Sequence, residues 1–172
     1  MTLLTRATLT DLELRADGRT LVGLAVPYDV EAKIGTYTEV FRRGAFLDAT
    51  ANPAAVKLLG GHDANALPLG RALTLREDTA GLVGEFRVSA TRAGDDVLAL
   101  IADGAVSGLS IGFIPAEGGD RWNRDRTQVE RVKATLAEVS IVAFPAYAGA
   151  GILAVREALP SRAHLLGLAR WR

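Results

Sequence analysis

The sequence of 172 residues contains no cysteine and only two histidines. The absence of cysteine excludes a disulfide framework, a thiolate zinc site and a cysteine nucleophile. Two histidines are too few for a histidine-rich metal site. We therefore expect no metal site, and nothing in the sequence indicates a cofactor.

An excess of charge of one sign is lacking as well. Lys and Arg together number 20, as do Asp and Glu, so the formal net charge is zero. This balance indicates neither nucleic acid nor a membrane surface as the main partner. Charged residues interrupt segment 1–14, so it lacks the apolar core of a signal peptide. No run approaches the roughly 18 apolar residues of a membrane span. We expect a soluble protein in a cytoplasm-like compartment.

What is present is typical of a folded globular chain, because 49% of the residues are hydrophobic and only 6 are proline. The length fits one domain. Hydrophobic periodicity and turn residues predict mostly strands, two helices, one polar loop and a short amphipathic tail helix beyond Pro160. The strands are expected at 20–28, 37–41, 55–59, 71–76, 82–88, 107–114 and 132–144, the helices at 42–49 and 93–103, and the loop at 117–131. This order favours an α+β, mainly β domain with a barrel-like sheet, because the elements do not alternate as βαβ units.

A strand at 107–113 would place a serine in an unusual setting. The segment reads Ser-Gly-Leu-Ser-Ile-Gly-Phe. Alternation sends the large apolar side chains to the core and leaves Gly108, Ser110 and Gly112 on the opposite face. The two glycines would leave Ser110 open to an approaching peptide backbone. Ser107 falls on the other face and is the weaker nucleophile candidate. A solvent-facing serine in a glycine-rich strand is the alternative for this segment alone.

His62 follows a short apolar run and Gly60-Gly61. A histidine at such a strand-to-loop junction can act as a general base, because imidazole titrates near neutral pH. The alternative is a loop histidine hydrogen-bonded to Asp63.

Glu138 interrupts the apolar strand 136–142. Alternation places Glu138 and Ser140 on one face, and Val139 and Ile141 on the other. A carboxylate here could hold an imidazole in the correct tautomer. The alternative is an ordinary outer-face glutamate. Serine chemistry needs all three residue types, and the chain offers one of each away from the apolar side.

These segments resemble the signature blocks of the caudovirus prohead protease family. The matching blocks are Gly61-His62-Asp63, Gly108–Phe113, and Leu136–Val142 followed by Phe144-Pro145-Ala146. Blocks at Gly23–Tyr28, Phe41–Phe46 and Pro68–Arg71 agree in order and spacing. The resemblance covers roughly residues 20–155, and the ordered series is more specific than any single motif.

The resemblance implies a fold related to herpesvirus assemblin, an antiparallel β-barrel surrounded by helices. The domain would span residues 1–155, and residues 156–172 would form a tail, helical or self-processed. It also implies the chain order histidine, serine, third member. That order makes His62 the general base, Ser110 the nucleophile and Glu138 the orienting acid, where assemblins use a second histidine.

The implied activity is that of a serine endopeptidase. It would act inside the procapsid, in the host cytoplasm, on scaffold protein, on the scaffold-like region of the major capsid protein, and on itself. Kinship with assemblin implies a possible homodimer. Backbone N–H groups should stabilise the oxyanion, and Arg71, Arg121 or Arg124 could help.

Two other interpretations stay open. A non-catalytic capsid-assembly or scaffolding module would keep the barrel without proteolysis, although three intact candidate residues argue against it. Segment 108–112 also matches the G-x-S-x-G elbow of α/β-hydrolases, with Ser110, Glu138 and His164 in that order. The elbow needs a sharp strand-to-helix turn, whereas the residues that follow continue in extended style. The esterase interpretation therefore ranks below the protease.

Overall fold

The computed structural model describes residues 3–9 and 12–143, with the backbone alone for residues 7–9. The predicted tail at 156–172, its helix and His164 lie outside the described residues.

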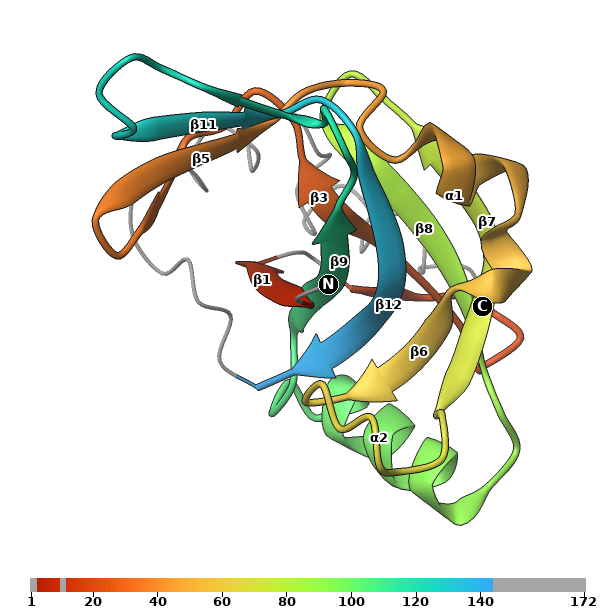
Figure 1. Cartoon of the computed structure of the whole chain (residues 1–172). Helices are drawn as coiled ribbons and strands as arrows, with labels where there is room; N and C mark the ends of the chain where they lie inside the picture. Colours follow the sequence, from red (N-terminus) through yellow and green to blue (C-terminus); the bar gives the residue numbers. More distant parts are fainter. Residues whose placement is uncertain (1–2, 10–11, 144–172) are drawn as a thin grey trace.

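A curled sheet of eight strands forms most of the molecule (Figure 1). Its strand order is β1-β9-β12-β6-β7-β8-β3-β2. In chain order the bounds are β1 Leu4–Leu9, β2 Glu13–Leu14, β3 Thr20–Pro27, β6 Lys57–Gly60, β7 Gly70–Glu77, β8 Gly81–Val88, β9 Gly108–Pro115 and β12 Ala134–Val142. Neighbouring strands run antiparallel except β6 and β12, which are parallel. Among the described residues no ladder joins β1 to β2, so the sheet is a half-barrel and not the closed antiparallel barrel expected from the sequence.

The predicted hairpin and strands agree closely with this sheet. In β8 the buried side chains of Leu82, Phe86 and Val88 alternate with more exposed ones, as the period of two requires. In β9 the side chains of Leu109, Ile111 and Phe113 are at most 1% exposed and lie in the core. The inward face predicted for the serine-bearing strand is therefore confirmed.

A second sheet of four strands, in the order β10-β11-β5-β4, lies at one end of the half-barrel (Figure 1). Its bounds are β4 Ala32–Ile34, β5 Tyr37–Phe41, β10 Asp120–Trp122 and β11 Gln128–Arg131. The expectation of a polar loop over the whole of 117–131 was therefore wrong, because β10 and β11 pair there as a hairpin. Their inward side chains are partly charged, so the apolar alternation that marks a strand is missing.

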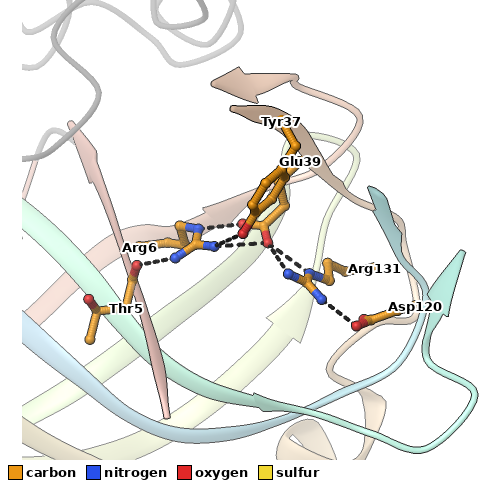
Figure 2. Close-up of polar contacts among 6 residues, drawn as sticks. All are labelled: Thr5, Arg6, Tyr37, Glu39, Asp120 and Arg131. Carbon is orange, nitrogen blue, oxygen red and sulfur yellow. Dashed lines mark hydrogen bonds and ion pairs between the residues drawn. The ribbon is translucent and has the colours of Figure 1, made fainter. Parts of the chain in front are cut away.

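A buried ion network explains those inward charges (Figure 2). Glu39, 1% exposed, accepts hydrogen bonds from Arg6 of β1 and from Arg131 of β11, the latter at 2.7 Å. Arg131 also bonds Asp120 at 2.5 Å. The two guanidinium groups lie 5.6 and 5.7 Å from the ring centroid of Phe113. Two cations and two anions balance each other where the network joins the two sheets, and among the described residues only Asp120 Oδ1 is a buried side-chain polar atom without a hydrogen-bond partner.

Two α-helices and a short 3₁₀ turn complete the described chain. Helix α2, Arg92–Ala102, matches the prediction, and the Thr91 hydroxyl caps it by accepting the Gly94 N–H at 3.1 Å. Helix α1 spans only Leu47–Ala51, whereas a helix at 42–49 was expected. Gly44 has φ +93°, which no helical residue adopts, so the chain turns before the helix begins. None of the helices in the described part is long and apolar enough to cross a membrane.

Candidate active site

The three predicted site residues meet on three adjacent strands of the large sheet. Strand β12 is central and carries Glu138, β9 lies on one side with Ser110, and β6 on the other side leads to His62 (Figure 1). In the register, Ser110 is directly opposite Ser140, and Gly112 is opposite Glu138. Residues directly opposite each other share a face, so this register gathers the polar groups on one face of the sheet.

Ser110 lies in the middle of a continuous strand and is only 1% exposed. The face was predicted correctly, but the expectation of an open serine was wrong. The chain that follows β6 brings the imidazole of His62 onto the hydroxyl. Gly112, two residues further along, thus makes room for a side chain from the neighbouring strand β12.

A register shift in β12 sets the direction of the Glu138 side chain. Leu136 is paired with Phe113 in the core, and the next pair is Glu138 with Gly112, so Ala137 is an extra residue. Such a bulge changes which residues face inward, because strict alternation would send positions 136 and 138 to the same side. It lets an inward leucine stand two residues before an outward carboxylate.

Gly112 provides the space that the carboxylate occupies. A Cβ atom at this position would lie 2.3 Å from Glu138 Oε1 and 3.0 Å from Cδ and Cγ. The Glu138 side chain therefore lies directly across the Gly112 backbone, and it is 5% exposed. A residue with any side chain at position 112 would displace the acid.

A tight turn after β6 positions His62. Gly61 and His62 have φ +58° and +62°, and the Asp63 N–H donates to the Gly60 carbonyl at 3.1 Å. Positive φ is costly for a residue with a side chain, by about 1–2 kcal/mol. The turn is fixed to β12 by the Gly61 N–H, which donates to the Ile141 carbonyl at 3.0 Å. Such strain often marks functional positions.

A continuous hydrogen-bonded series joins the three side chains. His62 Nε2 lies 2.5 Å from Ser110 Oγ, and His62 Nδ1 lies 2.6 Å from Glu138 Oε1. A carboxylate only accepts, so Nδ1 carries the proton and Nε2 is free to accept from the hydroxyl. The imidazole is therefore in the tautomer that a general base requires. Its side chain is 23% exposed and is the most solvent-accessible of the three.

Sequence reasoning placed Ser140 on this face but missed its contacts. Its hydroxyl donates to Glu138 Oε2 at 2.7 Å and accepts the backbone N–H of His62 at 3.0 Å. It is 0% exposed. The only available signal was the i, i+2 spacing to Glu138 on one strand.

Three arginines and the G-x-S-x-G segment are the other candidates that lie among the described residues. In the described part of the chain, no hydrogen bond links Arg71, Arg121 or Arg124 to Ser110 or His62, and Arg71 bonds the Ala72 carbonyl instead. The G-x-S-x-G segment lies inside β9 and not at a strand-to-helix turn, so it is not a nucleophile elbow. Residues 3–9 and 12–143 contain no group of three or more His, Asp or Glu side chains that could hold a metal ion.

A mainly β fold that brings a serine, a histidine and a carboxylate into one hydrogen-bonded series has the arrangement seen in serine hydrolases. The model of the family described as caudovirus prohead serine protease matches residues 7–163. The chain belongs to this family.

The solved structure of the bacteriophage T4 capsid assembly protease, gp21, is similar to this chain. The similarity covers 84% of this chain and 98% of that chain, with a TM-score of 0.62 and 12% sequence identity. At this identity the likeness shows a shared fold. The comparison with curated proteins finds no match.

Proposed function

We propose that this protein is the serine endopeptidase that processes capsid components during procapsid maturation. The observation that carries the proposal is the series Glu138–His62–Ser110, with contacts of 2.6 and 2.5 Å on a strained turn and two strands. Membership of the prohead serine protease family supports the same reaction class. The name of the T4 relative, a capsid assembly protease, supports capsid proteins as substrates.

The reaction is acyl transfer. His62 Nε2 takes the Ser110 proton while Oγ bonds to the scissile carbonyl carbon, and the carbonyl oxygen becomes an oxyanion. The imidazolium then gives its proton to the leaving amine as the C–N bond breaks. Water attacks the acyl-enzyme by the same route, giving the free carboxylate and restoring Ser110. Glu138 accepts the Nδ1–H throughout and stabilises the imidazolium.

The substrates we propose are scaffold protein, the scaffold-like region of the major capsid protein, and this chain itself. The protein would then act inside the procapsid. Self-processing would fall in an accessible segment, and the tail at 156–172 is the candidate from the sequence.

The test compares Ser110→Ala with Ser107→Ala and the unaltered chain, each incubated with its capsid and scaffold proteins. Ser107 is exposed and precedes β9, so its substitution is the matched control. Intact mass spectrometry should find new products with the unaltered chain and Ser107→Ala, and none with Ser110→Ala.

Equal cleavage by both variants would remove Ser110 from the mechanism. Absence of products with verified, folded partners would favour the non-catalytic assembly module. His164→Ala and His62→Ala separate the esterase interpretation, which requires loss of activity only in the first. We expect loss only in the second.

A further inference from the structure

The structure assigns a fourth member to the site: we propose that Ser140 is a positioning residue that holds both the acid and the base in place. The proposal rests on the function proposed above. Ser140 touches no reacting atom, since its hydroxyl contacts Glu138 Oε2 and the backbone N–H of His62. It is therefore not a catalytic residue.

The carboxylate needs this second contact because it has two oxygens and one imidazole. Oε1 accepts from His62 Nδ1, and Oε2 accepts from the Ser140 hydroxyl at 2.7 Å. A glutamate side chain has three rotatable bonds, and one hydrogen bond leaves its carboxyl plane free to rotate. Two contacts at opposite oxygens orient the group, and Gly112 below it leaves the space in which it lies.

The same hydroxyl supports the strained histidine. It accepts the His62 N–H at 3.0 Å, at a residue with φ +62°. A left-handed non-glycine residue persists only where its surroundings determine it. One hydroxyl proton and one lone pair thus connect the acid's side chain to the base's backbone, and Ser140 is 0% exposed, so no solvent replaces either contact.

Loss of this hydroxyl has a specific consequence. An alanine at position 140 would leave a buried N–H and a buried carboxylate oxygen without partners. Glu138 and His62 would be held less firmly, while Ser110 and the surface that binds a ligand would be unchanged. We therefore expect unchanged binding and a chemical step slowed about 10- to 100-fold, the range found for groups that orient metal ligands by hydrogen bonding.

A fluorophosphonate probe tests this without a natural substrate. Ser110 Oγ bonds to phosphorus, the P–F bond breaks, fluoride leaves, and His62 takes the hydroxyl proton. Intact mass gives the labelling rate over a range of probe concentrations, which separates the maximal rate from the apparent binding constant. Ser140→Ala should lower the maximal rate about 10- to 100-fold with an unchanged binding constant. Thr135→Ala, exposed on the same strand, is the matched control and should react like the unaltered chain.

A spectroscopic readout follows the positioning itself. The Nδ1 proton shared with Glu138 should give a low-field proton resonance, and the chain has only two histidines, so His164→Ala assigns it. We expect Ser140→Ala to shift or broaden this resonance, and Thr135→Ala to preserve it. If circular dichroism shows that Ser140→Ala does not fold, Ser140→Cys is measured instead. Its thiol takes the place of the hydroxyl but is only a weak hydrogen-bond donor.

The outcomes separate the two proposals. Unchanged labelling and an unchanged resonance in the Ser140 variant overturn the positioning role and leave the protease assignment intact. A lower maximal rate together with a perturbed resonance supports it. Failure of the unaltered chain to label at all overturns the proposed function. The resonance then decides the role of Ser140: its loss on substitution supports the role, and its persistence overturns it.

Discussion

The exchange Gly112→Ala tests whether catalysis depends on where the Glu138 carboxylate lies. The added methyl would stand 2.3 Å from Oε1, whereas ordinary contact begins at 3.4 Å. The oxygen must therefore retreat by about 1 Å, which takes it out of reach of an imidazole now 2.6 Å away. A displacement of about 1 Å at a catalytic group lowers the rate about 100-fold. Overpacking should lower the unfolding free energy by about 1–3 kcal/mol.

The assay is the fluorophosphonate labelling rate of Ser110, with chemical denaturation run in parallel. Gly60→Ala is the control, since its Cβ would meet only the end of the Leu69 side chain at 3.4 Å, and we expect a rate within a few-fold of the unaltered chain.

A double-mutant cycle with Glu138→Ala tests whether Gly112→Ala acts through the Glu138 side chain. Two substitutions acting through the same group are not additive. Gly112→Ala should therefore slow labelling about 100-fold in the unaltered background and have little effect once Glu138 is alanine. Equal slowing in both backgrounds would refute the argument, because the methyl would then be acting elsewhere. Undiminished labelling by a folded Gly112→Ala protein would refute it too.

Two further predictions concern the stability of the fold outside the site. Glu39→Gln should lower the unfolding free energy by about 3–5 kcal/mol, because it leaves a buried guanidinium charge uncompensated. Glu85→Gln, in an exposed ion pair, is the control and should change the unfolding free energy by at most about 1 kcal/mol. Comparable losses of both variants in a denaturant titration would contradict the role of the buried network. Hydrogen bonds from the Arg19 backbone and the Thr20 side chain lower the pKa of Asp17 from 3.8 to about 2. Its stabilisation is therefore complete above about pH 4 and is lost as the pH falls towards 2. Asp17→Asn should lose less stability than the unaltered chain over that interval, and identical acid titrations would count against this.

Much of the fold could be predicted because the relevant signals are local. Alternation in 82–88, the Thr91 cap and the glycine-bounded strands all depend on neighbouring residues, and they agree with the structure. The 117–131 hairpin could not be predicted, because Arg131 is buried against Glu39, which is distant in sequence. Closure of the sheet was also beyond local signals, since it depends on whether the two edge strands meet.

In the site too, features set by local sequence could be predicted and features set by distant contacts could not. Ser110, His62 and Glu138 could be proposed from strand alternation and family motifs, since the sequence immediately around each residue is enough to single it out. The bulge at Ala137, the left-handed His62 and the double contact of Ser140 could not, because each depends on pairing between β12 and β6 or β9. The exposure of Ser110 was misjudged for the same reason, since its cover comes from a turn 48 residues away in sequence.

The environment of Glu138 favours a catalytic domain over a purely structural one. The carboxylate is 5% exposed, and its hydrogen-bond partners in the described part of the chain are an imidazole and a hydroxyl, with no Arg or Lys ion pair. Burying a carboxylate costs several kcal/mol unless it is well paired, and apolar residues of similar volume often stabilise a core equally well. The buried network around Glu39 shows how this fold balances charge where only stability is needed, with two guanidinium groups on one carboxylate. Glu138 lacks such a cation until His62 is protonated. In the proposed mechanism that occurs when the histidine accepts the proton of Ser110, so the carboxylate would gain its cation at the moment the nucleophile forms.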